Sequence, residues 1–180
     1  MQKILVVASS LDGYIAQRRD QVSTAWTSEA DRHWFGQISK EIGILIMGLT
    51  TYQTIGRPLP GRRTIVLCER GAIEAPEVTD FSLTSEAALY QSAGMEVTAM
   101  LQLLEERGVQ RVAICGGASV YQSFLQAGLV DEIYLTLEPV FLGGGIQLVG
   151  EKGLKQPQKW QVIERQALSE QTIVFHLRKE

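Results

Sequence analysis

The sequence is poor in the side chains that bind metals or form disulfide bridges. Its 180 residues include two cysteines, Cys68 and Cys115, and two histidines, His33 and His176. Each cysteine ends an apolar run, which is typical of a free, buried thiol in a cytoplasmic protein rather than of a disulfide. The two histidines are far apart along the chain, so the sequence predicts no metal site.

Long apolar runs and a surplus of positive charge are also missing. The longest apolar run, IGILIMGL at 42–49, is far shorter than the roughly 20 residues that span a bilayer. The apolar stretch at 3–8 is too short for a secretory signal. A formal net charge of −3 gives no electrostatic footprint for nucleic acid or an anionic membrane. We therefore expect neither of these as a partner.

Short apolar runs alternate with helical patterns along the whole chain. The runs predict strands that are mostly buried on both faces, at 3–8, 44–47, 64–68, 111–115 and 132–137. Helical patterns start at Ser28 and cover 50–55, 97–108 and 119–128, and two alternating segments at 160–168 and 171–179 predict an antiparallel hairpin. The expected architecture is a single α/β domain over 1–180, with a mostly parallel central sheet, helices on both faces and an antiparallel C-terminal hairpin.

An acidic residue, Asp31, occupies a position where the helical pattern calls for an apolar one. Ser28 and Asp31 have the three-residue spacing of a capping box. Asp31 also begins the row that continues with Phe35, Ile38 and Ile42, which is the apolar face of the predicted helix. Asp31 is therefore either a helix cap or a buried acid with a chemical role.

Two junctions between a strand and a helix are candidate phosphate sites. In AICGGASVY at 113–121, a buried strand runs through Gly116 and Gly117 directly into a helix. The N-terminus of a helix favours anions, although a glycine pair also permits a tight turn with close packing. The strand at 44–47 ends at Gly48, and we expect Thr50 or Thr51 to cap the next helix.

Three further segments each allow a plain and a functional interpretation. The stiff loop GRPLPGRR at 56–63 is a solvated charged turn or presents Arg62 to an anion as a bidentate fork. Asp12 is expected to form a turn, and the segment from 10 to about 25 is a candidate lid over a site. Thr136 is a buried hydroxyl in an apolar strand, or a second polar group beside Asp31.

Taken together, these residues resemble the dihydrofolate reductase superfamily, which includes dihydrofolate reductase and the RibD C-terminal reductase type of riboflavin biosynthesis. WTSEADRHWF (26–35) and IMGLTTYQTIGRPLPGR (46–62) are similar to dihydrofolate reductase. SLDGYIA (10–16) and the stretch 116–145 are closer to the riboflavin type. The resemblance covers nearly the whole chain. It implies a dihydrofolate reductase-like fold and NADPH-dependent hydride transfer to a pyrimidine- or pterin-type small molecule.

The resemblance also implies roles position by position. Asp31 would hold the heterocycle and assist its protonation, Trp26 would be the lid tryptophan, and Thr136 would hydrogen-bond to the acid. The implied substrate-binding residues are Phe35, Ile55, Leu59 and Arg62, with Arg62 facing an anionic group. The implied cofactor-binding residues are Ala8, Ile15, Gly48, Thr50, Thr51, Cys115, Gly116, Gly117, Ala118, Ser119 and Val120.

The natural substrate stays open between related heterocycles. A reductase like that acting on 5-amino-6-(5-phosphoribosylamino)uracil is favoured by the N-terminal loop and the C-terminal half. Dihydrofolate is favoured by the segment from Trp26 to Arg62, and Ile55-Gly56-Arg57 replaces an acidic motif of the riboflavin type. Leu49 stands where an arginine usually meets the 2′-phosphate of NADPH, so NADH is not excluded.

The alternative to an enzyme is a non-catalytic homologue that binds a nucleotide. Leu49 and Glu69 are the features that favour it. The resemblance to the riboflavin type also implies a homodimer.

Overall fold

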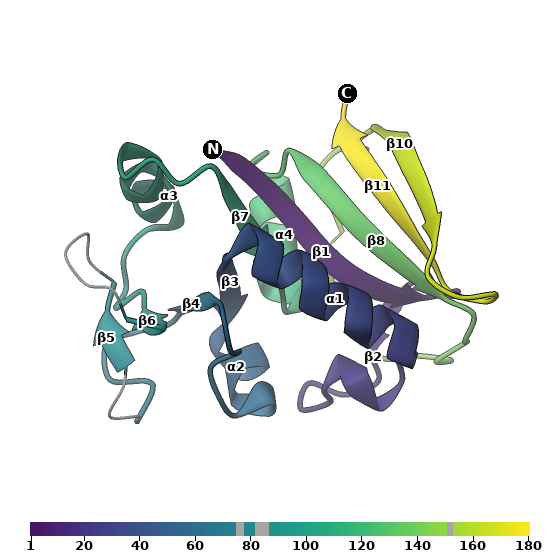
Figure 1. The fold of residues 1–180 in the computed structure, drawn as a ribbon, viewed down its shortest axis with the longest axis horizontal. Helices are drawn as coiled ribbons and strands as arrows, with labels where there is room; N and C mark the ends of the chain where they lie inside the picture. The colour runs from purple at the N-terminus through teal and green to yellow at the C-terminus, as the bar shows by residue number, and fades with distance from the viewer. Residues whose placement is uncertain (75–77, 82–86, 151–152) are drawn as a thin grey trace.

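Strands and helices alternate through the computed structural model, which describes residues 1–74, 78–81, 87–150 and 153–180 (Figure 1). The helices are α1 (Glu29–Ile42), α2 (Leu49–Ile55), α3 (Val97–Glu106) and α4 (Ala118–Gln126), with a short 3-10 turn at Ser23–Ala25. The strands are β1 (Gln2–Ser10), β2 (Tyr14–Ala16), β3 (Ile44–Gly48), β4 (Arg63–Leu67), β5 (Val78–Asp80), β6 (Leu89–Gln91), β7 (Arg111–Ile114), β8 (Glu132–Glu138), β9 (Ile146–Gln147), β10 (Trp160–Ala167) and β11 (Ile173–Lys179).

A nine-stranded sheet with the order β10-β11-β8-β1-β7-β3-β4-β6-β5 organises the chain. All pairs from β8 to β5 are parallel, whereas β11 pairs antiparallel with β8 and β10. The apolar runs of the sequence form the central strands. These strands are apolar throughout because a parallel sheet is covered on both faces. The expected α/β fold with an antiparallel C-terminal hairpin is confirmed.

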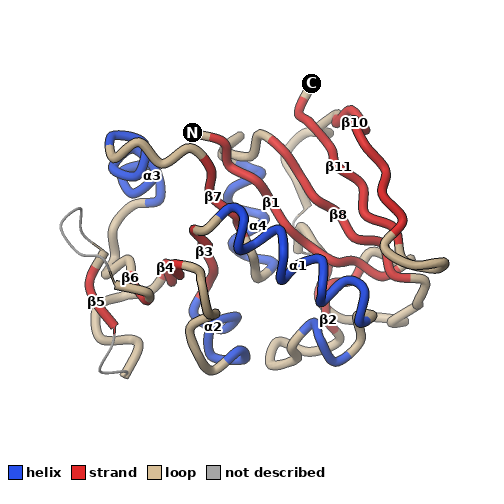
Figure 2. The backbone as a smooth tube through the Cα atoms, in the orientation of Figure 1, coloured by secondary structure: helices blue, strands red, loops and turns tan. Residues whose placement is uncertain are grey.

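Helices cover the two faces of the sheet, and alternate side chains of β1 pack against the helices on each face. Leu5 and Val7 contribute to the apolar cluster under α3 and α4, while Ile4 and Val6 belong to the cluster under α1 and α2. Figure 2 shows α1 crossing one face with α4 behind the sheet, and β10 and β11 at the edge beyond them. None of the helices in the described part of the chain is long and apolar enough to cross a membrane.

Four short strands were not predicted from the sequence. β5, β6, β2 and β9 contain two or three residues each, which is too few to show a period of two. β2 lies inside the segment 10–25 that was considered as a lid, and it pairs antiparallel with β9.

The parallel topology brings the ends of the central strands together at one edge of the sheet. β1, β3, β7 and β8 all point the same way, and α2 and β2 lie along the edge where these strands end (Figure 1). In open α/β sheets, ligands bind beyond the carboxyl ends of the strands. The functional site is therefore to be sought at this edge.

We predict that the core under α4 depends strongly on Phe124, whose side chain is 1% exposed. Phe124→Ala should lower the free energy of unfolding by about 3–5 kcal/mol, because it leaves a cavity between α4 and the sheet. Phe141→Ala is the matched control, since Phe141 is 73% exposed, and it should change stability by less than about 0.5 kcal/mol. Urea denaturation of both variants measures the difference, and equal losses would contradict the packing.

Candidate active site

Asp31 is held at the start of α1 by a cap in which its own carboxylate takes no part. The side chain of Ser28 accepts the backbone N–H of Asp31 at 3.1 Å, as the capping spacing predicted. In a full capping box, the third residue of the helix would accept the N–H of the cap in return. Here the N–H of Ser28 instead donates to Glu138 Oε1 at 2.8 Å. The cap is confirmed, and the Asp31 carboxylate is left for another purpose.

The Asp31 carboxylate lies between α1 and the sheet, and its residue is only 7% exposed. Burial raises its pKa, and the charge of Glu138 acts in the same direction. The side chains of Thr136 and Thr27 and the positive charge of Arg32 lower it in part. Asp31 and Thr136 are thus brought together, although they are far apart in the sequence.

Two buried polar groups in the segment just before α1 have no hydrogen-bond partner among the described residues. Among the residues that the structure describes, Trp26 Nε1 and Thr27 Oγ1 make no hydrogen bond. Thr27 Oγ1 faces the Asp31 carboxylate closely enough to lower its pKa, but without hydrogen-bonding geometry. Buried groups of this kind usually find a partner, so they fit a polar ligand or water at Asp31.

The same face of α1 leads from Asp31 to Arg62. Ser39 lies two turns beyond Asp31, about 12 Å along the helix axis at 1.5 Å per residue, and Phe35 lies between them. The Arg62 guanidinium donates from Nη1 to the Ser39 hydroxyl at 2.7 Å, and burial lowers the pKa of Arg62. Arg62 is therefore a fixed side chain packed against α1 rather than a solvated turn residue.

The remaining residues implied for the substrate lie on the same side of the sheet. Phe35, Ile55 and Leu59 all pack against the apolar cluster that contains Trp34 and Met47. Asp31 lies on α1 and Arg62 contacts the same helix on the same side of the sheet, at levels about 12 Å apart along the helix axis.

Helices α2 and α4 begin side by side, next to the ends of β3 and β7. The N–H of Gly48 donates to the carbonyl of Gly116 at 2.7 Å. A Cβ atom at Gly117 would lie 3.2 Å from Thr51 Oγ1, and one at Gly48 would lie 3.1 Å from Val120 Cγ2. A side chain at either position would push its neighbour aside by a few tenths of an ångström, so glycine favours this close contact between the two helix N-termini.

Neither threonine caps α2, so this expectation was wrong. The N-cap residue is Gly48, and Thr50 and Thr51 lie within the first turn of the helix. Gly117 occupies the corresponding place before α4. A glycine has no side chain with which to cap a helix. Backbone N–H groups at the N-termini of α2 and α4 are therefore available to an anion.

The other residues implied for the cofactor lie around this junction or on the neighbouring strands. Ala8 is the register partner of Thr136 in the β1–β8 pair. Ile15 packs against the α4-side cluster. Ala118 and Ser119 form the first turn of α4. Cys115 is a free cysteine whose pKa is raised to about 12 by burial, which makes the thiol unreactive.

The beginning of the candidate lid is tied to the loop before β9. The Asp12 carboxylate accepts the N–H of Leu142 at 3.1 Å and that of Gly143 at 2.7 Å. Gly145 has a φ of 133°, and a Cβ atom there would collide with the carbonyl oxygen of Ala16. Asp12 is thus an anchor of the turn, as expected, and Gly145 permits the close approach of the two loops.

Sequence reasoning missed two residues of this site. The Tyr121 hydroxyl donates to the carbonyl of Val6 at 2.8 Å, and a Cβ atom at Gly116 would lie 3.1 Å from it. In the sequence, Tyr121 only continues the apolar face of a helix. Glu138 was missed as well, although its spacing of two from Thr136 placed both on one face of a strand.

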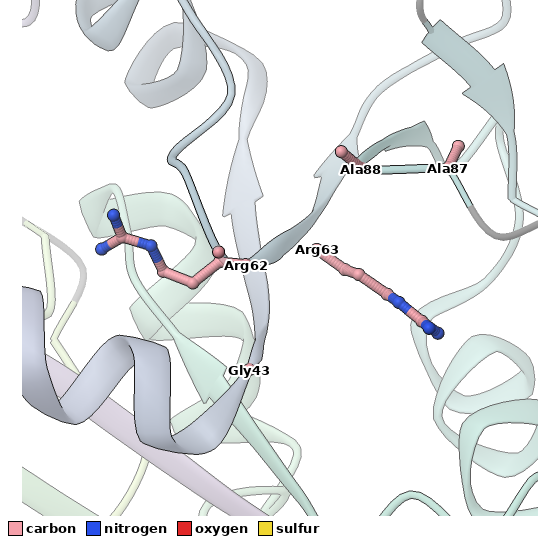
Figure 3. A pocket seen from close by; sticks show the side chains of 6 residues that line it. Gly43, Arg62, Arg63, Ala87 and Ala88 are labelled. Carbon is pink, nitrogen blue, oxygen red and sulfur yellow. The ribbon is translucent and has the colours of Figure 1, made fainter.

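A surface hollow lies at the opposite end of the strands and shares only Arg62 with the candidate site. Its volume is about 360 Å³, and it is lined by Gly43, Gly61, Arg62, Arg63, Ala87 and Ala88. Figure 3 shows the Arg62 and Arg63 side chains pointing in opposite directions. The lining contains no acid, whereas the edge with Asp31 holds an acid, unpartnered polar atoms and two helix N-termini.

Residues 3–174 match the RibD C-terminal domain family. The chain belongs to this family. Its fold agrees with that of a RibD-type protein from Thermotoga maritima, a diaminohydroxyphosphoribosylaminopyrimidine deaminase/5-amino-6-(5-phosphoribosylamino)uracil reductase. The TM-score is 0.79 at 19% identity, over 99% of this chain and 56% of that one.

Curated relatives of this RibD C-terminal domain include reductases of two kinds. A 2,5-diamino-6-ribosylamino-4(3H)-pyrimidinone 5′-phosphate reductase of Archaeoglobus fulgidus is 34% identical over 46% of this chain and 37% of its own length. The dihydrofolate reductase HdrB of Haloferax volcanii is 36% identical over 48% of this chain and 43% of its own length. The matched part is therefore less than half of each relative.

The raised pKa of Asp31 predicts a dependence of stability on pH. Because the folded-state pKa lies above the ordinary value of 3.8, this group favours folding most below 3.8, and the contribution is lost as the pH rises through the folded pKa. Asp31→Asn should therefore be more stable than the parent protein at pH 7, with a gain that shrinks as the pH falls. Denaturation between pH 4 and 8 measures this gain.

The control is Asp20→Asn, at an aspartate whose side chain is 78% exposed, and its effect should stay within about 0.5 kcal/mol. A loss of stability in Asp31→Asn at pH 7 would show that the carboxylate is structural.

Proposed function

We propose that this RibD C-terminal domain is a reductase that transfers hydride from a nicotinamide cofactor to a pyrimidine- or pterin-type substrate. The observation that carries the proposal is the Asp31 carboxylate, which is buried and forms no ion pair with a cation among the residues that the structure describes. Trp26 Nε1, five residues earlier in the chain, is buried without a hydrogen-bond partner in the same part of the structure. Burying a charge in this way costs stability, which is typical of an acid retained for chemistry.

The junction of α2 and α4 fits the pyrophosphate of a dinucleotide. Glycines at the contact let the phosphates approach the backbone, and the dipoles of two helices favour their charge. Gly48, Thr51 and Gly116 to Val120 are the residues that we propose for this role. Ala8 and Ile15 would flank the nicotinamide, which supplies the hydride when it is bound.

Asp31 would hold the heterocycle and supply a proton to the nitrogen of the reduced C=N bond. Its raised pKa lets the carboxyl group keep a proton at a higher pH than an ordinary aspartate does. Thr136 would orient the carboxyl group, while Trp26 and Thr27 would meet polar atoms of the substrate. The apolar side chains of Phe35, Ile55 and Leu59 would exclude water, which strengthens these polar contacts.

The family and the archaeal relative support a ribosylaminopyrimidine phosphate as the substrate, as in the reduction of 5-amino-6-(5-phosphoribosylamino)uracil. Dihydrofolate is the second candidate, because the acid and the cation lie far apart on one face of α1. A separation of about 12 Å between the levels of Asp31 and Ser39 along the helix suits a long substrate with a terminal carboxylate. The phosphate of the pyrimidine would also be recognised by Arg62.

NADPH is the cofactor that we propose, with NADH as the alternative. Leu49 offers no charge to a 2′-phosphate, and Arg70 is paired with Asp80 at 2.7 Å. Arg63 begins β4, at the end of the strand away from the α2–α4 junction, and so does not replace the missing arginine. Comparison of the two cofactors is therefore part of the test.

We further propose that residues 1–180 act as one domain and assemble as a homodimer. β1 pairs with β7 and β8, which brings distant parts of the chain into one sheet. The outer strand β10 is exposed along most of its length, with Val162 48% exposed. Such an edge is suited to a partner.

The decisive experiment measures the oxidation of NADPH and NADH with each candidate substrate. We expect turnover with the ribosylaminopyrimidine phosphate and slower or no turnover with dihydrofolate. Asp31→Asn should lower kcat by about 100-fold or more, as expected when a proton donor is lost, while the Kd for NADPH changes by less than about twofold. Cofactor binding without turnover of either substrate would overturn the reductase proposal.

Arg62 and Arg63 form a matched pair for testing the anion site. Arg62→Ala should raise KM for an anionic substrate by about tenfold or more, because a charged hydrogen bond is lost. Arg63→Ala should leave KM within about twofold, since this neighbouring side chain points away from α1 (Figure 3). Equal effects of the two substitutions would remove Arg62 from the site.

A further inference from the structure

A second buried carboxylate, Glu138, joins three parts of the chain beside Asp31. It ends β8 and is only 3% exposed. Its Oε1 accepts the N–H and the hydroxyl of Ser28, both at 2.8 Å. Its Oε2 accepts the hydroxyl of Thr172, just before β11, at 3.1 Å.

These hydrogen bonds leave the Asp31 carboxylate outside the cap of α1. In a complete capping box, the side chain of Asp31 would accept a hydrogen bond from the N–H of Ser28. Glu138 occupies that donor, so α1 is capped without Asp31. Thr136 lies two residues before Glu138 on the same face of β8 and faces Asp31 from the sheet.

We infer that Glu138 is a positioning residue of the reductase site, which takes over the capping bond and thereby directs the Asp31 carboxylate toward the substrate. The inference rests on the proposed function for its catalytic consequence, but the direction in which Asp31 points can be tested separately. Glu138 itself touches neither substrate nor cofactor in this scheme.

The charge of Glu138 has a second effect. The charged groups that act on Asp31 are Glu138 from β8, which raises its pKa, and Arg32 from its own helix, which lowers it. A neighbouring carboxylate disfavours ionisation of Asp31. Glu138 therefore also helps Asp31 to keep the proton that the reaction uses.

Two substitutions separate the hydrogen bond from the charge. Glu138→Gln keeps an oxygen for the Ser28 N–H and removes the charge, so Asp31 should titrate at lower pH while kcat at low pH falls by less than about threefold. Glu138→Ala frees the Ser28 N–H for the Asp31 side chain. We then expect kcat to fall by about 10- to 100-fold, as for a misplaced catalytic group, with the Kd for NADPH within about twofold.

Glu132→Gln is the matched control. Glu132 is a buried carboxylate on the same face of β8, bonded to His176 and Arg178, and it lies about 20 Å from Glu138 along the strand. It should lower stability without moving the titration of Asp31.

The measurement is the pH titration of the Asp31 carboxyl carbon by NMR, together with pH profiles of kcat. An unchanged Asp31 titration in Glu138→Gln, or full kcat in Glu138→Ala, would overturn the inference. If the parent protein shows no turnover, the proposed function fails. The NMR titration would still decide whether Glu138 controls Asp31, because it needs no substrate.

Discussion

The parallel pairing of β1 with β7 and β8 is the constraint on which the rest of the structure depends. Parallel neighbours require crossover connections, so α1 and α4 are carried to opposite faces of the sheet and the central strands end at one edge. There β1 ends at Ser10 and β8 at Glu138, which are partners in register. The residues that we assign to the reaction lie at this edge or on the helices that begin there, except Leu59 and Arg62, which lie in the loop between α2 and β4.

In the proposed reaction, helix α1 carries the catalytic acid, and its N-terminus is capped by residues other than that acid. Ser28 caps the helix and Glu138 accepts the N–H of Ser28, so the Asp31 carboxylate lies buried beside Thr136 and Thr27. A buried acid without a bonded cation is unfavourable for stability. We therefore propose that Asp31 is retained for proton transfer.

Local patterns in the sequence predicted the parts of the structure that depend on neighbours in the chain. The central strands, the cap at Ser28 and the C-terminal hairpin all follow from spacing within a few residues. Thr50 or Thr51 was wrongly expected to cap α2, because the contact of Gly48 with Gly116 is formed between residues far apart in sequence. The short strands β5 and β6 escaped because three residues carry no clear period.

The candidate site was predicted in part for the same reason. Asp31 stood out as an acid on an apolar face, but only the resemblance to a family linked it with Thr136. Glu138 could not be foreseen, because its bond to Ser28 spans 110 positions. The bond of Arg62 to Ser39 spans 23 and arises from the packing of a loop on α1.

The most direct test of the central claim is a crystal structure of the protein with an oxidised nicotinamide cofactor and the pyrimidine substrate. We predict that the Asp31 carboxylate lies within hydrogen-bonding distance of the heterocycle and that the cofactor pyrophosphate lies at Gly116 and Gly117. A heterocycle bound away from Asp31, for example in the hollow beside Gly43 and Arg63, would contradict the assignment.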